Sequence, residues 1–409
     1  MKIGIELRSL QNGSKYRGIG EVVKQVTNRA MVMAARDGHE MVFYEYDGGD
    51  NPKELLDIPK DLKYSVVKQG PNPDDNPTLT RLQRFKNTWR ALFGEPVVGS
   101  CESDVFFQCE YSLGVPRNTR TVLVKHDLIP LLFWDLYMDS PWRHWQHKAL
   151  RTGLRVFYKN YHWKRVLRRS VRNADTIIAV SNQTKKDLES LLHVSPRKVE
   201  VVYNGVSIQA TKTGKSETTE SKMLTKPYLL FVGVGADERR RVGDLVDAFN
   251  NLKADGHDIQ LALVGSSLDS AEELPDHAAG LRNSIINSSY RDDILMMGYV
   301  DDDTKQKLFH EALAFVFPTL YEGFGIPILE AFLLGCPVIA YKNSSIPEVG
   351  GDYAIYVNDW WGIKKEVEKL LVQDKRERRK NIDAAKKHAE KFTWDKTAKK
   401  IYEELVRET

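Results

Sequence analysis

The chain has 409 residues, more than one hydrophobic core usually holds, and this length predicts two domains. Hydrophobic residues make up 42% and charged residues 28%, values near the averages of soluble domains, so the composition excludes a disordered or fibrous protein. The formal net charge of +4 is small, but the basic residues are unevenly distributed along the chain.

Cysteine usage and the first residues both bear on the compartment. Cys101, Cys109 and Cys336 lack the spacing of metal ligands and are too few for a disulfide framework, which favours a reducing environment. The stretch from Lys2 to Leu7 already has the pattern of a strand, and no charged region with an apolar segment precedes it. No run of about 18 apolar residues occurs. We therefore expect a cytoplasmic chain without a signal peptide or a membrane-spanning helix.

Short apolar runs alternate with helical patterns along the whole chain. Strands that are separated by helices favour parallel sheets built from right-handed βαβ units, so we expect an α/β protein with two doubly wound domains. The predicted strands of the first half are Ile3 to Leu7, Met41 to Tyr46, Val105 to Gln108, Thr121 to Lys125 and Thr176 to Val180. Those of the second half are Tyr228 to Val232, Gln260 to Val264, Ala312 to Pro318 and Val338 to Tyr341.

A polar segment separates the two halves. Residues 209–226 consist mainly of Thr, Lys, Ser and Glu, which cannot contribute to a core, so we predict a linker or exposed loop there. The first domain is then expected to cover residues 1–208 and the second residues 227–390. We expect the last part, residues 391–409, to form a helix that packs back on the first domain.

The lysine-rich segment from Lys375 to Arg407 has a helical pattern near the C-terminus. Phe392 and Trp394 mark a break in this pattern. Beyond the break, we expect Ile401 and Leu405 to lie on a buried face of the helix.

A glycine-containing segment between two predicted strands of the second half is the most specific signal in the chain. Gly323 and Gly325 precede a predicted helix in which Pro327 takes the first helical position, where its missing N–H is no loss. Gly335 follows at the expected end of that helix. The positive end of the helix dipole and the unpaired amides of the loop suit a phosphate or diphosphate.

Two glutamates accompany this helix start. Glu330 is expected in the first helical turn, where a carboxylate can accept hydrogen bonds from both hydroxyls of a ribose. Glu322 lies in the loop and would face the next portion of the same ligand. Alternatively, both carboxylates only complement the helix dipole.

The same segment resembles the signature of a known family. GT-B glycosyltransferases, specifically the retaining family 4 enzymes, carry an E-x7-E element after a P-S/T-x-x-E-G-F-G segment. The run from Pro318 to Ala331, PTLYEGFGIPILEA, matches this signature almost residue for residue. The match continues in Gly335 to Ala340, Ser345 to Val349 and Gly298 to Val300, so the resemblance covers most of the chain.

The resemblance implies a GT-B fold, in which two Rossmann-like domains flank a cleft. The N-terminal domain would bind the acceptor and the C-terminal domain the donor nucleotide. By the same resemblance, Glu330 would hold the ribose, Glu322 would lie by the donor sugar and take part in catalysis, and Tyr299 would meet the base. The backbone amides expected to meet the sugar and diphosphate are those around Phe324, Gly325 and Ile326.

Three consecutive arginines follow a predicted strand and glycine turn at Phe231 to Gly233. Basic groups at a helix start can stabilise the negative charge that develops on a leaving nucleotide. The resembled family usually has an Arg-Lys pair at this place. Counting back from Ala248-Phe249 aligns Arg239 and Arg240 with that pair, although Arg241 leaves the register open by one residue. The alternative is a solvated helix end.

Two further candidate sites lie in the N-terminal half. The motif from Arg17 to Gly20 is weak by itself, but with Glu6 to Leu10 before it, it resembles the opening of O-antigen mannosyl- and rhamnosyltransferases. In those transferases, a glycine loop closes over the donor phosphates and the acceptor. By this resemblance, Gly18 and Gly20 would form that loop. His126 directly follows a predicted strand, at the edge where a cleft would lie. The resemblance assigns it to the donor sugar during catalysis; the alternative is a satisfied, half-buried histidine.

The stretch from Trp142 to Arg172 contains ten Lys and Arg residues and no Asp or Glu, interleaved with aromatic residues. Such a pattern is typical of a peripheral membrane surface, where each basic group near an anionic leaflet contributes roughly 1 kcal/mol. A nucleic-acid backbone or a solvated helix face would also fit. Because acceptors of the resembled family are often built on polyprenyl diphosphate, we expect an anionic membrane as the partner, at the inner membrane face, and no nucleic acid.

These features and the resemblance together predict a retaining hexosyltransferase that takes an NDP-sugar as co-substrate, and the resemblance implies that it needs no metal or other cofactor. Mannose or rhamnose is favoured because the opening from Gly18 to Gly20 resembles transferases of those sugars, and the acceptor would be a glycan or polyprenyl-linked glycan in bacterial-type surface polysaccharide assembly. The aspartates from Asp301 to Asp303 are expected to cap the following helix rather than to bind a metal. Alternatives are a protein-modifying glycosyltransferase and a non-catalytic glycosyltransferase-like subunit.

Overall fold

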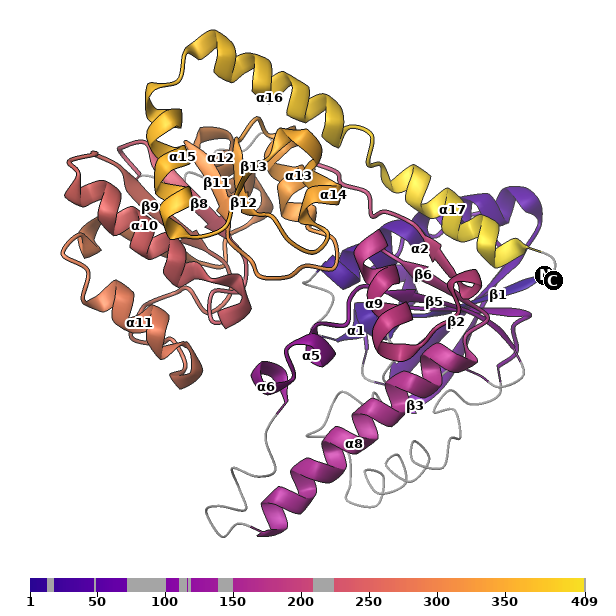
Figure 1. Ribbon diagram of the computed structural model, residues 1–409. Helices are drawn as coiled ribbons and strands as arrows, with labels where there is room; N and C mark the ends of the chain where they lie inside the picture. The colour runs from indigo at the N-terminus through magenta and orange to yellow at the C-terminus, as the bar shows by residue number, and fades with distance from the viewer. Residues whose placement is uncertain are drawn as a thin grey trace. The chain divides into compact units, whose positions relative to one another are not determined.

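A computed structural model describes residues 1–12, 18–47, 49–71, 101–109, 116, 119–138, 150–208 and 224–407 (Figure 1). The chain divides into two compact units, each with its own sheet. Unit 1 comprises Met1–Gly205 together with Thr393–Thr409, and unit 2 comprises Val206–Phe392. Most of the predicted linker, residues 209–223, lies outside the described residues.

Unit 1 contains a seven-stranded parallel sheet in the order β3-β2-β1-β4-β5-β6-β7. This order extends the one that is typical of Rossmann folds, with β1 at the point where the order reverses. The strands are β1 Lys2–Glu6, β2 Glu40–Asp47, β3 Tyr64–Pro71, β4 Val105–Gln108, β5 Arg120–Lys125, β6 Thr176–Ala179 and β7 Val199–Val201.

In the described part of unit 1, helices lie between β1 and β2, β2 and β3, β5 and β6, and β6 and β7, as parallel pairing requires. The described helices of unit 1 are α1 Arg8–Gln11, α2 Gly18–Asp37, α3 Pro52–Leu55, α5 Ile129–Leu132, α6 Trp134–Tyr137, α8 Leu150–Asn173, α9 Asn182–Leu192, the 3-10 helix η2 Pro196–Lys198 and α17 Trp394–Val406. The last helix, α17, packs along α2 and buries Ile401 and Leu405, as the pattern of the C-terminal segment predicts.

Unit 2 contains a six-stranded parallel sheet in the order β10-β9-β8-β11-β12-β13, again with the Rossmann arrangement. Its strands are β8 Tyr228–Val232, β9 Gln260–Val264, β10 Ile294–Gly298, β11 Ala314–Phe317, β12 Val338–Tyr341 and β13 Ile355–Val357. The main helices are α10 Val242–Ala254, α11 Ala279–Ile286, α12 Asp302–Glu311, α13 Ile326–Leu333, α14 Ile346–Gly350, α15 Trp360–Val372 and α16 Lys375–Ala389. The short 3-10 helices are η4 Glu238–Arg240, η5 Asp276–Ala278, η6 Arg291–Asp293 and η7 Gly351–Tyr353.

The two parallel sheets confirm the α/β class. The strands expected from apolar runs are the internal strands of both sheets, each within two residues of the expected bounds. The edge strands β3, β7, β10 and β13 were not expected. The burial of β7 and β13 explains this, because each has three residues and only one of them is buried. An edge strand carries polar residues on its open side and therefore lacks the continuous apolar run of an internal strand.

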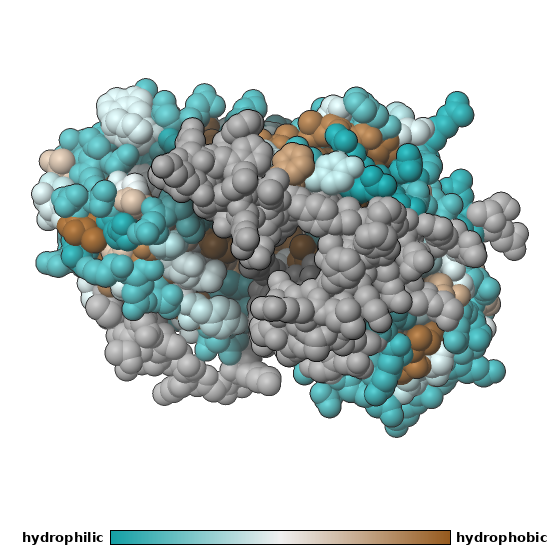
Figure 2. Space-filling view, turned by 90° about the horizontal axis from the view of Figure 1, so that it is seen from below, coloured by the Kyte–Doolittle hydropathy of each residue, from teal (hydrophilic) through white to brown (hydrophobic). Residues whose placement is uncertain are grey.

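The core of unit 2 is built from the central strands and the helices that cover them. Phe231, Leu263 and Val316 come from three neighbouring strands and pack with Phe249 of α10 and Ile363 of α15 in one buried cluster. On the face seen in Figure 2, hydrophilic residues cover much of the described surface. Among the described residues, no helix is both long and apolar enough to cross a membrane.

Candidate functional site

The candidate site of unit 2 lies where the strand order reverses. Strand β8 pairs with β9 on one side and with β11 on the other, so the loops after β8 and β11 lead away from the sheet in opposite directions. Open α/β sheets bind ligands outside the carboxyl ends of such strands. Gly233 and Gly265 leave this edge of the sheet without side chains at their positions. A Cβ on Gly265, whose φ is +132°, would lie 1.9 Å from the Gly233 carbonyl oxygen.

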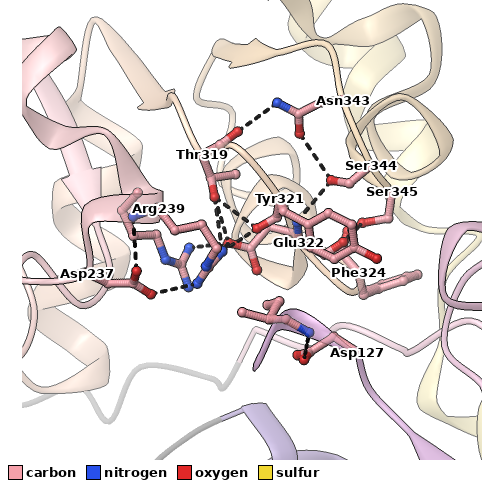
Figure 3. Close-up of polar contacts among 12 residues, drawn as sticks. Asp127, Asp237, Arg239, Thr319, Tyr321, Glu322, Phe324, Asn343, Ser344 and Ser345 are labelled. Atoms are coloured by element: carbon pink, nitrogen blue, oxygen red, sulfur yellow. Dashed lines mark hydrogen bonds and ion pairs between the residues drawn. The ribbon is translucent and has the colours of Figure 1, made fainter. Parts of the chain in front are cut away.

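Glu322, in the loop between β11 and α13, is the centre of a charged cluster (Figure 3). Its Oε1 atom lies 2.8 Å from Nη1 of Arg239 and 2.6 Å from Nη1 of Arg240. The Thr319 hydroxyl donates a hydrogen bond of 3.2 Å to the same oxygen. Because the Glu322 side chain is only 12% exposed, two guanidinium groups compensate a carboxylate that has lost most of its water.

The three arginines have different surroundings. Arg239 is 5% exposed, and its guanidinium donates to Asp237 and to the Tyr321 carbonyl as well as to Glu322. The guanidinium of Arg240 lies over the Phe317 ring at 5.3 Å, and its buried Nε has no partner among the described residues.

Arg241 points away from this cluster. It has a φ of 50°, its side chain is 49% exposed, and it pairs with Asp244 at 2.8 Å. The structure therefore brings together the two arginines that the sequence alignment selected, Arg239 and Arg240, and leaves the third outside.

The loop after β12 holds the glycine segment in place. The Ser345 hydroxyl is buried and donates to the carbonyls of Glu322, at 2.9 Å, and Phe324, at 2.8 Å. The Glu322 amide donates to the Ser344 hydroxyl, and the Asn343 amide group donates to the Thr319 carbonyl (Figure 3). Sequence reasoning quoted Ser345 within the family match but assigned these three residues no role. Their position directly after the strand next to β11 was the available signal.

The helix after the glycine segment begins one residue earlier than predicted. Gly325 takes a left-handed conformation, with φ 110° and ψ 47°, and ends the loop as the N-cap of α13. Ile326 is therefore the first helical residue and Pro327 the second. Glu330 becomes the fifth residue of the helix, so its predicted place in the first turn is wrong. Within the described residues, the Gly325 and Ile326 amides donate no hydrogen bond, and both remain available to an anion.

Glu330 lies on α13, and Tyr299 lies in the loop after β10. The Glu330 carboxylate, 18% exposed, pairs through Oε1 with Nζ of Lys305 on α12 at 3.1 Å. Tyr299 follows β10 and is 78% exposed, so its ring is free to stack on a planar ligand. Phe324 is buried and packs edge-on against Phe392 at 6.1 Å, which leaves only its backbone for a ligand.

His126 follows β5 in unit 1. Its Nε2 atom is enclosed and has no partner among the described residues. Burial, together with the nearby charge of Lys125, lowers the pKa of His126 to about 3, so the imidazole is neutral at physiological pH. The Thr184 hydroxyl donates to the His126 backbone carbonyl at 3.2 Å and fixes the end of the strand.

Gly18 and Gly20 lie at the start of α2, whose first residue is Gly18. Gly18 is exposed and Gly20 is buried, while residues 13–17, including Arg17 of the predicted motif, lie outside the described residues. Because β1 and β5 belong to one parallel sheet, the end of β1 at Glu6 and the residue His126 after β5 share the carboxyl edge of unit 1.

The aspartates from Asp301 to Asp303 lie at the start of α12. Asp301 is the N-cap of α12 and accepts a hydrogen bond of 2.7 Å from the Thr304 amide, as predicted. No three His, Cys, Asp or Glu side chains among the described residues are grouped as a metal site.

Part of the basic segment, residues 142–149, lies outside the described residues, and the remainder forms most of α8. Phe157 and Tyr161 of this helix are 55% and 49% exposed. Arg165, Arg168 and Arg172 are exposed too. Spacings of three and four residues place these five side chains along one face of the helix.

Two family models match the chain, one for each half. The model described as "Glycosyltransferase Family 4" matches residues 22–210, and "Glycosyl transferases group 1" matches residues 215–388. The chain is a member of the GT-B glycosyltransferases. Together, the matches cover the sheet edges that carry His126 and the Glu322 cluster.

The curated relatives of this glycosyltransferase include O-antigen mannosyltransferases. The serotype-specific mannosyltransferase WbdA of Escherichia coli is 27% identical over 100% of this chain, and the match spans 48% of its length. The O-antigen chain mannosyltransferase RfbU of Salmonella typhimurium is 25% identical over 62% of this chain and 66% of its own. The chain thus spans about half the length of WbdA.

Solved structures confirm the predicted GT-B fold. Anabaena HepE, crystallised with UDP and glucose, superposes with a TM-score of 0.63 at 15% identity, over 99% of both chains. WaaG, a glycosyltransferase involved in lipopolysaccharide biosynthesis, superposes with a TM-score of 0.60 at 15% identity over 100% of both chains.

Proposed function

We propose that this glycosyltransferase moves a hexose from an NDP-sugar to a glycan or lipid-linked glycan in surface polysaccharide assembly, with retention of the anomeric configuration. The observation that carries this proposal is the cluster in which Arg239 and Arg240 converge on Glu322, at the reversal point of the unit 2 sheet. A carboxylate, two guanidinium groups and the open amides of Gly325 and Ile326 are the groups that a sugar diphosphate needs.

The division of labour follows from burial. Arg239 is fixed inside the loop by Asp237 and Tyr321, so its part is to hold Glu322 in position. Arg240 has fewer partners and, with the start of α13, takes the charge that develops on the leaving diphosphate. Because guanidinium groups and helix amides supply this charge stabilisation, the proposed reaction needs no metal ion.

The choice of sugar rests on the relatives. Mannose is favoured, with rhamnose second, because WbdA and RfbU are named mannosyltransferases and align with most of this chain. The base of the nucleotide is proposed to be uracil or guanine, and uracil is considered because HepE was crystallised with UDP. Tyr299 is the side chain proposed to stack on this base. Glu330 is proposed to bind the ribose, and His126, as an uncharged imidazole, is proposed to serve the transferred sugar without adding a charge.

A donor panel tests the proposal. The purified protein is incubated with UDP-, GDP- and dTDP-sugars, and both thermal stabilisation and slow donor hydrolysis are measured, with and without EDTA. We expect one nucleotide to stabilise the protein and the matching sugar nucleotide to be hydrolysed at the same rate in EDTA. Binding without any turnover would support a non-catalytic subunit, and absence of binding would contradict the proposed function.

We also propose that the exposed face of α8 binds an anionic membrane surface, which would bring the enzyme to a lipid-linked acceptor. The supporting observation is the order of side chains along the helix. Phe157 and Tyr161 are followed by Arg165, Arg168 and Arg172, and Arg165 donates to the Tyr161 hydroxyl at 3.2 Å. Aromatic rings suit the lipid interface and the arginines suit its phosphates.

Co-sedimentation with phosphatidylglycerol vesicles at low salt tests this surface. The double variant Arg165→Glu/Arg168→Glu should lose binding, because two attractions become repulsions. Lys186→Glu/Arg197→Glu, with the same change of charge on exposed residues elsewhere in unit 1, should keep it. Equal binding of both variants, or none by the unaltered protein, would remove α8 as a membrane contact.

A further inference from the structure

An ion pair links two helices beside the proposed ribose site. Nζ of Lys305, on α12, lies 3.1 Å from Oε1 of Glu330, on α13. Both side chains are largely covered, with exposures of 25% and 18%. A pair in such surroundings is screened less than one at the open surface, so it restrains the carboxylate more than an exposed lysine would.

The geometry leaves part of the Glu330 carboxylate open. An ionised carboxylate can accept about four hydrogen bonds, and Lys305 uses one of them, on Oε1. Among the described residues, no other side chain pairs with Glu330. The remaining capacity, including all of Oε2, is enough for the two hydroxyl donors of a ribose.

Lys305 keeps its charge in this position. Burial lowers the pKa of the Lys305 ammonium, but the Glu330 and Asp302 carboxylates outweigh burial, and the pKa lies above its ordinary value. Asp302 lies 3.2 Å from Nζ and is 58% exposed, so its contribution is screened by water, and Glu330 is the partner that matters.

We propose that Lys305 is a positioning residue for nucleotide recognition: it holds the Glu330 carboxylate oriented so that its free lone pairs meet the ribose hydroxyls of the donor. This inference rests on the proposed function, because it requires Glu330 to bind ribose. Without the ammonium of Lys305, the Glu330 side chain can adopt other rotamers, and the ribose hydroxyls must then order the carboxylate before they can bind it.

The test compares nucleotides that differ only in their ribose hydroxyls. Binding of the nucleoside diphosphate found in the donor panel, and of its 2′,3′-dideoxy analogue, is measured by calorimetry for the unaltered protein and Lys305→Met. We expect Lys305→Met to bind the natural nucleotide roughly tenfold more weakly. It should bind the dideoxy analogue as well as the unaltered protein does, because no hydroxyl then needs the carboxylate.

Two further variants separate positioning from a structural role. Lys305→Arg should restore most of the lost affinity, and adding Lys305→Met to Glu330→Gln should cost nothing more. Lys307→Met removes an exposed lysine from the same helix and should leave binding unchanged. If Lys305→Met weakens both nucleotides equally, the lysine contacts the ligand itself or only supports the fold, and the inference is overturned.

Failure of the proposed function would look different. In that case the unaltered protein would bind neither nucleotide. The assignment of the ribose site and the assignment of Lys305 would then both be wrong. If the unaltered protein binds and Lys305→Met binds equally well, the donor site stands and only the assignment of Lys305 is wrong.

Discussion

Units 1 and 2 have the same strand order around their first strand, but they present their candidate residues in opposite electrostatic states. In unit 2, Glu322 is already compensated by Arg239 and Arg240. In unit 1, His126 is neutral, and its enclosed Nε2 has no partner among the described residues. The comparison shows two electrostatic states at the same kind of sheet edge: charged groups that compensate one another, and an uncharged group with a nitrogen that has no partner in the described part of the chain.

The largest effect should come from breaking the charged cluster of unit 2. Glu322→Gln removes the only carboxylate that both Arg239 and Arg240 contact within the described residues. We expect a loss of about 3 to 5 kcal/mol of stability, because buried guanidinium groups lose their compensating charge. Turnover should fall roughly 100-fold or more. Urea denaturation and sugar-transfer rates measure the two effects.

Glu311→Gln is the matched control for this prediction, because Glu311 is exposed at the end of α12. It should change neither quantity. If Glu322→Gln is as stable as the unaltered protein, the cluster is not a compensated buried network, and the contrast between the units loses its basis.

The neutral state of His126 makes a pH-dependent prediction for unit 1. Its pKa is about 3 in the folded protein, whereas an unfolded histidine titrates near 6.5. Below about pH 6.5 the unfolded state therefore binds an extra proton, and stability falls as the pH decreases toward 3, by about 1.4 kcal/mol per pH unit. Between pH 7 and pH 5 the contribution is about 2 kcal/mol.

His126→Gln should remove this part of the pH dependence, measured by urea denaturation at both pH values. His277→Gln, which changes an exposed histidine of unit 2, should keep it. If the stability of His126→Gln changes with pH in parallel with that of the unaltered protein, the imidazole takes up its proton in the folded state as it does in the unfolded chain. His126 would then be charged at pH 5, and the electrostatic contrast with unit 2 would be lost.

Backbone conformation at the glycine segment should have a smaller effect. Gly325→Ala places a side chain at φ 110°, although the nearest atom, on Ile346, would lie at 3.4 Å and leave room. The cost is thus conformational, about 1 to 3 kcal/mol in thermal or urea unfolding. Gly280→Ala in α11 has open space and no positive φ, so it should be neutral or stabilising by up to about 1 kcal/mol.

The smallest predicted effects are losses of stability when the N-cap residue of one helix in each unit is replaced. Asp374 caps α16 of unit 2 by accepting from the Arg376 and Glu377 amides, and Thr393 caps α17 of unit 1 by accepting from the Lys396 amide. Replacing either cap by Ala should cost about 1 kcal/mol. In calorimetry, Asp374→Ala should lower the unfolding temperature of unit 2, and Thr393→Ala should lower that of unit 1. Lys380→Ala, at an exposed position of α16, should lower neither temperature. A shift of both transitions by one variant would show that the units unfold together.

Much of this architecture could be predicted from the sequence, because the relevant signals are local. The internal strands are continuous apolar runs, and the segment from Tyr321 to Glu330 combines glycines, a proline and two glutamates within ten residues. The edge strands could not be predicted in the same way, since β13 buries only one residue fully. The start of α13 at Ile326 depends on the left-handed conformation of Gly325, which composition permits but does not specify.

The partners of the site residues were beyond sequence reasoning for a different reason. Ser345 holds the carbonyls of Glu322 and Phe324, and Lys305 pairs with Glu330 from a helix 25 positions away in the chain. Serine and lysine are common on protein surfaces, and only their position in the folded unit gives them these contacts. Candidate binding residues can thus be proposed from motifs, but the residues that hold them in place cannot.

The return of the chain to unit 1 after Phe392 has a consequence for synthesis on the ribosome. Unit 2 is one continuous stretch, Val206–Phe392, whereas unit 1 needs α17, which begins at Trp394, to cover α2. Domains usually complete their folding in the order in which they emerge. Here the order is reversed: the second nascent unit can close first, while the first keeps an apolar helix face uncovered until Ile401 and Leu405 leave the exit tunnel.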